Sequence, residues 1–132
     1  MPRKSRLLVD IVIPVFNEAA VVEQTHASLR KVLDTLPQSF RIYYVDDGSS
    51  DGTPDTLARL AEQDRAVQVI ELSRNFGHQA ALTAGLEAAL GDIVITMDAD
   101  GQHPPELIPQ MLDLVKQGYD IVQTQRMEAT QS

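Results

Sequence analysis

Two carboxylates, Asp98 and Asp100, stand two residues apart in the segment DADGQH, directly after the apolar run 93–97. Side chains at this spacing on an extended chain point to the same side, so both carboxylates can bind one cation. Carboxylate oxygens suit Mg²⁺ or Mn²⁺, and the chain has no cysteine that would favour a softer metal. Gln102 offers a further oxygen to this cation. The spacing therefore indicates a divalent-metal site, where the oxygens of a diphosphate would complete the coordination shell.

An Asp-x-Asp pair by itself is more often a solvated turn than a metal site. Here the pair ends a run of valine and isoleucine that is typical of a buried strand, and this context favours the metal site. His103 stands directly before Pro104. We interpret His103 as a helix cap rather than as a metal ligand.

Three other polar segments follow apolar runs: PVFNE at 14–18, DDGSSDGT at 46–53 and SRNFGHQ at 73–79. DDGSSDGT begins like a calcium-binding EF-hand loop, but Ala58 stands where the closing glutamate belongs. A nucleotide-contacting turn fits better, because a carboxylate there can accept a base N–H or ribose hydroxyls, although simple turn chemistry explains any one residue equally well. Arg74 precedes a predicted helix and His78 begins it, and the amides at the start of a helix favour phosphates. Arg74 is explained equally well as a surface residue, and His78 as a helix cap.

Composition and missing motifs exclude several functions. With 19 acidic and 11 basic residues the net charge is −8, which disfavours binding to nucleic acid or anionic lipid, and a phosphate ligand would need a metal. Neither G-x-x-x-x-G-K-[ST] nor G-x-G-x-x-G occurs, which argues against a P-loop or a Rossmann dinucleotide site.

The basic N-terminus leads into a strand-like run that is broken by Asp10 and Pro14, and it does not resemble a signal peptide. We expect no transmembrane segment. The absence of cysteine leaves the compartment open but fits a reducing cytosol, and we expect a cytoplasmic location.

The segments that must position these residues alternate between two patterns. Five apolar runs predict buried strands at 7–13, 40–45, 67–72, 93–97 and 119–122. Helical spacing predicts four helices: 18–36 with Asn17 as N-cap, a second from Thr53-Pro54, a third at 78–90 ended by Gly91, and a fourth at 104–118. Such alternation predicts a three-layer α/β/α fold with a mainly parallel sheet, and ligands at the carboxyl ends of its strands. The four polar loops would meet at that edge.

Two residues within the predicted helices have expected packing roles. His26 falls on the apolar stripe of the first helix, and we interpret it as a packing residue. Gly85 lies in an alanine- and leucine-rich helix, and its small size would allow close packing on the sheet.

The strings VIPVFNE, VDDGSSDGT, LSRNFGHQAALTAGLEAALGD and MDADGQHPPELIP cover nearly the whole chain. In this order and spacing they resemble the family-2 glycosyltransferases of the GT-A fold, especially the branch related to dolichyl-phosphate mannose synthase and bacterial polyprenyl-phosphate glycosyltransferases. The resemblance implies a nucleotide-sugar-binding domain over residues 1–126, and the sequence itself predicts a frayed tail at 127–132.

The resemblance also implies roles for the four loops. The residues implied to line the base and ribose are Pro14, Phe16, Glu18 and Asp47, with Asp46 nearby. Asp98 would lie against the sugar or ribose, Asp100 and Gln102 would bind the metal, and Arg74 and His78 would approach the donor. The implied reaction transfers a sugar, with inversion, from a UDP- or GDP-type donor, and a polyprenyl phosphate is among the implied acceptors. The metal would stabilise the departing diphosphate.

The chain ends shortly after GYDIVQTQR, before the region that carries the acceptor-binding part and the catalytic carboxylate in this family. Arg126 matches the family, whereas Gln125 stands where many relatives have a small residue. We expect the chain to bind a nucleotide sugar but to transfer the sugar poorly. Full-length relatives often act at the cytoplasmic face of a membrane, and the last predicted strand could pair with a second copy in a homo-oligomer.

Three alternatives differ from this interpretation. A haloacid-dehalogenase-type phosphatase would phosphorylate Asp98, but it normally carries its pair on the first strand, and Lys116 is the one later lysine here. A receiver-like module would use Asp46 and Asp47 and would leave DADGQH unexplained. A non-catalytic nucleotide-binding module differs only in turnover.

Overall fold

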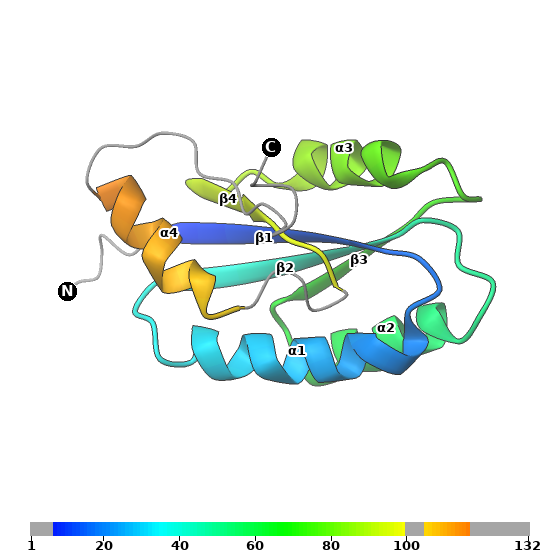
Figure 1. Ribbon diagram of the computed structural model, residues 1–132, viewed down its shortest axis with the longest axis horizontal. Helices are drawn as coiled ribbons and strands as arrows, with labels where there is room; N and C mark the ends of the chain where they lie inside the picture. The colour runs from blue at the N-terminus through cyan, green and yellow to red at the C-terminus, as the bar shows by residue number, and fades with distance from the viewer. Residues whose placement is uncertain (1–6, 100–104, 117–132) are drawn as a thin grey trace, which may run out of the picture.

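The computed structural model describes residues 7–99 and 105–116, in which strands and helices alternate along the chain (Figure 1). The elements are β1 (Leu8–Val15), α1 (Ala19–Leu33), β2 (Ser39–Asp46), α2 (Thr53–Gln63), β3 (Val67–Glu71), α3 (His78–Ala88), β4 (Ile93–Thr96) and α4 (Leu107–Lys116). The sheet has the order β3-β2-β1-β4, and its three described pairings are parallel. This confirms the predicted α/β fold. The predicted strand at 119–122 and the tail at 127–132 lie outside the described residues.

Helices cover both faces of the sheet, with α1 and α2 on one face and α3 on the other (Figure 1). Alternate residues of β1 explain this arrangement, because Ile11 and Ile13 belong to the core that includes α1, α2 and α4, whereas Val12 belongs to the core beneath α3. Both faces are therefore apolar, as expected of a parallel sheet. Within the described ranges, no helix is long and apolar enough to cross a membrane.

Two glycines bring α3 and the chain after it close to the sheet. A methyl group on Gly85 would overlap the Val12 side chain and press on that of Val45, so the predicted close packing is confirmed. Gly91 does not end α3 as predicted, because the helix ends at Ala88 and Ala89 turns into an extended conformation that buries its side chain. Instead, the Gly91 amide donates a hydrogen bond of 2.7 Å to the Asp10 carboxylate.

Asp10, which interrupts the first apolar run, is completely buried in β1. Arg41, its partner in the parallel register on β2, donates two hydrogen bonds of 2.8 and 2.9 Å to its two carboxylate oxygens. A buried carboxylate is tolerated only when it is paired in this way. The pair lies toward the amino-terminal end of the strands, away from the loops predicted to bind a ligand.

The helix α1 begins and ends differently from the prediction. Asn17 is not its N-cap, since the helix starts at Ala19 after Glu18. Its other end is at Leu33, because the amides of Thr35 and Leu36 turn back onto carbonyls three residues earlier, each at 3.1 Å. The start of α2 differs by one residue, because Thr53, predicted as the cap, is the first residue of the helix after Gly52, and Pro54 lies in its first turn.

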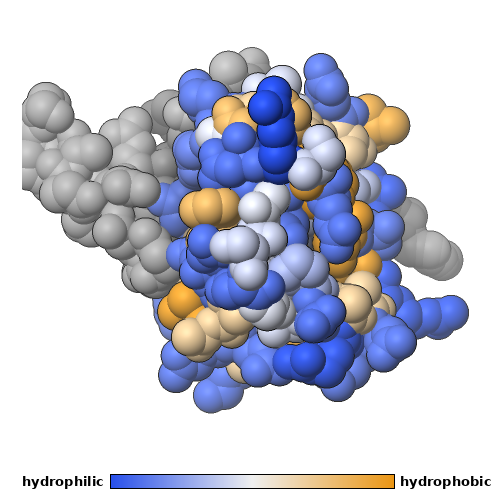
Figure 2. Space-filling model, turned by 90° about the vertical axis from the view of Figure 1, so that its right-hand side faces the viewer, coloured by the Kyte–Doolittle hydropathy of each residue, from blue (hydrophilic) through white to orange (hydrophobic). Residues whose placement is uncertain are grey.

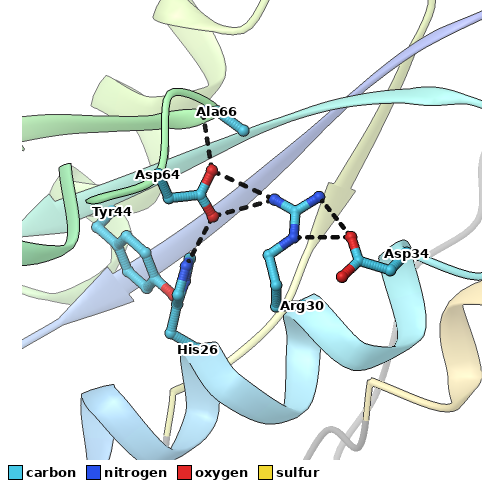
Figure 3. A network of polar contacts seen from close by, with 6 residues as sticks. All are labelled: His26, Arg30, Asp34, Tyr44, Asp64 and Ala66. Atoms are coloured by element: carbon cyan, nitrogen blue, oxygen red, sulfur yellow. Dashed lines mark hydrogen bonds and ion pairs between the residues drawn. The ribbon is translucent and has the colours of Figure 1, made fainter. Parts of the chain in front are cut away.

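His26 packs in the core, as predicted, and it also joins three elements through a polar network (Figure 3). One ring nitrogen lies 2.7 Å from the Tyr44 hydroxyl and the other lies 3.0 Å from the Asp64 carboxylate. Arg30 bonds the same carboxylate at 3.0 Å and also pairs with Asp34. The network ties α1 to β2 and to the start of β3, and burial raises the pKa of Tyr44 well above its usual range.

Asp64→Asn is expected to lower the free energy of unfolding near neutral pH and to lose this effect in acid. Burial opposes ionisation of Asp64, but hydrogen bonds from the Ala66 amide, Arg30 and His26 outweigh it and lower its pKa below the ordinary 3.8. A lowered pKa contributes stability that is present above the ordinary value and is lost as pH falls through the lowered pKa. Urea unfolding of both chains from about pH 7 to about pH 3 measures the difference, which should shrink below about pH 4.

Asp34→Asn is the matched control, because Asp34 also pairs with Arg30 but its side chain is 63% exposed. Its effect near neutral pH should be smaller than that of Asp64→Asn, as is usual for a solvated ion pair. A difference between wild type and Asp64→Asn that stays constant into acid would contradict the prediction.

Candidate functional site

The loops after all four described strands meet at the carboxyl edge of the sheet and enclose a pocket of about 340 Å³. Figure 2 views the molecule from this end, where hydrophilic residues surround smaller neutral and hydrophobic patches. The residues that line the pocket are Pro14, Val15, Phe16, Glu18, Asp47, Asn75, Gly77, His78, Asp98 and Ala99. Parallel strands explain this convergence, because all of their carboxyl ends lie at one edge.

The structure gathers most of the predicted site residues that it describes. Those in the pocket are Pro14, Phe16, Glu18, Asp47, His78 and Asp98. Asp46 and Arg74 do not line it. Asp46 is buried and accepts the Ser49 amide at 3.0 Å, whereas Arg74 is exposed with its guanidinium 4.7 Å from the centre of the Phe76 ring. Asp100, Gln102 and His103 lie outside the described residues.

Sequence reasoning missed four lining residues: Val15, Asn75, Gly77 and Ala99. Each is next to, or within the same loop as, a residue that was predicted. Asn75 and Gly77 belong to the string SRNFGHQ, which the sequence places at the site, although only Arg74 and His78 of this string were predicted as site residues. Val15 and Ala99 are apolar and offered no chemical signal of their own.

Asp47 connects the loop after β2 to the start of α3. Its carboxylate accepts the amide of Phe76 at 2.8 Å and that of Gly77 at 3.1 Å, while its own amide donates to the Val15 carbonyl at 2.9 Å. Asp47 is 4% exposed and nevertheless lines the pocket. A carboxylate has about four acceptor positions, so two amides leave it capacity for a ligand.

Gly48 allows this connection to form. It has a φ of 71°, in the left-handed region that favours glycine. A Cβ atom built on it would overlap the backbone of Arg74 and Asn75. The loops after β2 and β3 therefore touch through backbone atoms, and only glycine satisfies both requirements.

The loops after β1 and β2 are joined by reciprocal hydrogen bonds centred on Asn17, whose φ of 52° is tolerated by asparagine. Its side-chain oxygen accepts the Ser50 amide at 2.8 Å, and its own amide donates to the Ser49 hydroxyl at 2.8 Å. The next two amides, of Glu18 and Ala19, donate to Thr53 and Asp51 at 2.9 and 3.3 Å. The start of α1 is thus capped by the neighbouring loop instead of by Asn17, which corrects the predicted cap.

Asp51 also closes its own loop. Its carboxylate accepts hydrogen bonds from the hydroxyl and the amide of Thr53, which lower the pKa of Asp51 below its ordinary value. Asp51 therefore serves as a turn residue of this loop.

Asp98 reaches the pocket because the side chains that follow β4 alternate between the core and the pocket. Met97 and Ala99 are 2% and 1% exposed and belong to the main core, whereas Asp98 between them lines the pocket. The last described bond of this strand to β1 runs from the Met97 amide to the Val12 carbonyl at 3.1 Å. The motif therefore starts where sheet pairing stops.

The described pocket lining contains three carboxylates, Glu18, Asp47 and Asp98, together with His78, and no lysine or arginine. This lining would repel a diphosphate unless a cation lay between them. No group of three histidine or acidic side chains among the described residues is arranged to hold a metal alone. Mg²⁺-type ions typically use one or two protein carboxylates, with phosphates and water as the other ligands. The hard oxygen of Asp98 fits such a shared site.

Comparison with known proteins agrees with this geometry. A model of the family described as Glycosyl transferase family 2 matches residues 10–132. An uncharacterized glycosyltransferase of Bacillus subtilis (strain 168), YkcC, is 42% identical over 85% of this chain and 35% of its own length. The undecaprenyl-phosphate 4-deoxy-4-formamido-L-arabinose transferase of Pseudomonas aeruginosa (strain LESB58) is 44% identical over 95% of this chain and 37% of its own length. The chain thus spans about a third of the length of these curated relatives.

Solved structures show the same fold. A mannosyltransferase from Pyrobaculum calidifontis, in complex with GDP-Man and Mn²⁺, superposes with a TM-score of 0.64 at 31% identity over 72% of this chain and 28% of that one. Glucosyl-3-phosphoglycerate synthase from Mycobacterium tuberculosis has a TM-score of 0.66 at 23% identity over 83% of this chain and 39% of that one. The chain therefore belongs to glycosyltransferase family 2 and has the GT-A fold.

Proposed function

We propose that this chain is the donor-binding part of an inverting glycosyltransferase that takes its sugar from a UDP- or GDP-type nucleotide sugar. The observation that carries the proposal is the pocket lined by Glu18, Asp47 and Asp98 without a lysine or arginine among its described residues. Such a pocket accepts a nucleotide diphosphate only together with a divalent cation. The complex of the Pyrobaculum mannosyltransferase with GDP-Man and Mn²⁺ supports the same combination of ligands.

Each part of the pocket has a proposed role. Pro14 and the half-exposed ring of Phe16 form an apolar wall for the base, and Asp47 accepts a base N–H with the acceptor positions that the loop amides leave. Glu18 accepts hydrogen bonds from the ribose. Asp46 acts indirectly, by shaping the turn at Ser49.

The motif after β4 holds the charged end of the donor. Asp98, Asp100 and Gln102 would hold Mg²⁺ or Mn²⁺, which when bound stabilises the negative charge of the departing diphosphate. His78, at the start of α3, donates to a phosphate oxygen, where the helix amides also favour an anion. Arg74 would approach the donor only after leaving the Phe76 ring.

The acceptor and the base that deprotonates it are proposed to lie outside these 132 residues. The length of the curated relatives supports this proposal, as does the printed name of the Pseudomonas relative for an acceptor of the polyprenyl-phosphate class. A cytoplasmic location and a homo-oligomer remain predictions of the sequence. Family membership lends no support to a phosphatase. A receiver-like module would use Asp46 and Asp47, but Asp46 accepts the Ser49 amide and Asp47 accepts two amides of the loop after β3.

Isothermal titration of the 132-residue chain with UDP, GDP and their sugars tests the proposal. One nucleotide series should bind with Mn²⁺ and at least about tenfold more weakly with a chelator, because the acidic lining then faces the diphosphate directly. Repeating the titration with Mg²⁺ decides between the two ions. Equal affinity with and without metal for every nucleotide, or no binding at all, would contradict the proposal.

A further inference from the structure

The backbone of the Asp98-x-Asp100 motif is contacted by a residue outside every motif identified above. The hydroxyl of Thr25 on α1 donates a hydrogen bond of 2.7 Å to the carbonyl oxygen of Ala99. The two residues are 74 positions apart in the sequence. This bond joins α1 directly to the centre of the motif.

The bond acts where the sheet no longer controls the chain. The Met97 amide makes the last described bond from this segment to β1, and two residues further on the Ala99 carbonyl accepts the bond from Thr25. Burial of the small Ala99 side chain restrains its position, but a methyl group does little to orient the carbonyl. The directional hydrogen bond from Thr25 supplies that orientation.

The Ala99 carbonyl is part of the planar peptide unit that joins Ala99 to Asp100. A hydrogen bond to its oxygen fixes the course of the backbone directly after Asp98. Asp98 therefore lies between two backbone anchors, the Met97 amide bonded to Val12 and the Ala99 carbonyl bonded to Thr25.

Thr25 lies on a firmly anchored part of α1. Val22 and Leu29, about one turn away on either side, are fully buried, and His26 bonds to Tyr44 and Asp64. Because α1 cannot shift without disturbing these contacts, the Thr25 backbone is held in place relative to the sheet.

We propose that Thr25 is a positioning residue of the metal site, which holds the Ala99 peptide so that the preceding Asp98 faces the pocket where the metal and the diphosphate would lie. This proposal rests on the donor-binding function proposed above. Thr25 is not among the described residues that line the pocket. Its effect should therefore appear in metal affinity and not in metal-free contacts with the nucleotide.

Thr25→Val removes the hydroxyl at nearly constant volume, and Thr25→Ser keeps it. We expect Thr25→Val to raise the Mn²⁺ dissociation constant, measured with saturating nucleotide, by about tenfold, the size typical of groups that orient metal ligands. Thr25→Ser should stay within about twofold of wild type, and metal-free nucleotide affinity should not change in either variant. Thr35→Val is the matched control, because the Thr35 hydroxyl makes a bond of the same length, 2.7 Å, to Val32 at the exposed end of α1.

Hydrogen exchange provides a readout that needs neither metal nor nucleotide. Peptides that cover residues 96–99 should exchange at least about threefold faster in Thr25→Val than in wild type or Thr25→Ser. Unchanged exchange in these peptides would overturn the proposal, as would unchanged Mn²⁺ affinity or an equal loss of metal-free nucleotide affinity. If wild type itself shows no metal-dependent nucleotide binding, the proposed function fails, and the exchange result alone still decides whether Thr25 orients this segment.

Discussion

Asp98→Asn is expected to weaken Mn²⁺-dependent nucleotide binding by about 100-fold, equivalent to about 2.7 kcal/mol. The asparagine side chain has nearly the same shape, so the core contacts of Met97 and Ala99 on either side should persist. What changes is the charge, and a neutral amide is a much weaker ligand for a hard divalent cation. Calorimetric titration with nucleotide at a fixed, saturating Mn²⁺ concentration measures the effect.

The same substitution should have the opposite effect without metal. Removing one of the three described carboxylates of the pocket lowers its repulsion for the diphosphate, so metal-free affinity should stay the same or rise. Asp113→Asn, an exposed change on α4 that also removes one negative charge, controls for the net charge of the protein and should leave both affinities unchanged. An equal loss with and without Mn²⁺ would contradict a metal-binding role for Asp98.

Gly48→Ala is expected to lower the free energy of unfolding by about 2–4 kcal/mol and to abolish measurable nucleotide binding. Two effects combine, because alanine disfavours the left-handed φ of 71° and its methyl group would overlap the backbone of Arg74 and Asn75. Relief of the overlap must move the loop that carries Asn75, Gly77 and His78 away from the pocket. Chemical denaturation measures the first effect and calorimetry the second.

Gly52→Ala is the matched control within the same loop. Gly52 has a φ of −80°, and the nearest atom to a Cβ built there is the Ala19 Cβ at 3.9 Å. Its substitution should cost less than about 1 kcal/mol, the usual size for alanine at the start of a helix. Equal destabilisation by the two substitutions would show that backbone contact at Gly48 is not what holds the two loops together.

The local pattern of the sequence was sufficient to predict the fold class. Valine- and isoleucine-rich runs form β1 to β4, and helical spacing between them forms α1 to α4, because both patterns depend on burial along short segments. Alternation of the two element types then requires parallel pairing, which brings the loop ends together at one edge. This is why the sequence alone predicts that Glu18, Asp47, His78 and Asp98 lie together, and all four line the pocket.

Local pattern was insufficient wherever a side chain finds its partner in another loop. Asn17 has the position and the residue type of an N-cap, yet its partners are Ser49, Ser50 and Asp51, more than 30 residues away. Arg74 has the charge to meet a phosphate, yet it lies over the Phe76 ring outside the pocket. Periodicity along the chain carries no information about such pairs.

Asp46 and Asp47 show the same limit within one dipeptide. The two residues are chemically identical, but Asp46 turns to the Ser49 amide while Asp47 holds the amides of the loop after β3 and lines the pocket. Because both faces of the sheet are apolar, the alternation of polar and apolar residues does not tell which of the two aspartates lines the pocket.

The sequence by itself thus determined which elements form and at which edge of the sheet the acidic residues gather, since both follow from burial and from parallel pairing. Only the tertiary structure decided which of these residues line the pocket and which hold the loops together. It also revealed the hydrogen bond from Thr25 to the Ala99 carbonyl. This contact depends on how α1 packs on the sheet and not on the sequence near Thr25 or Ala99.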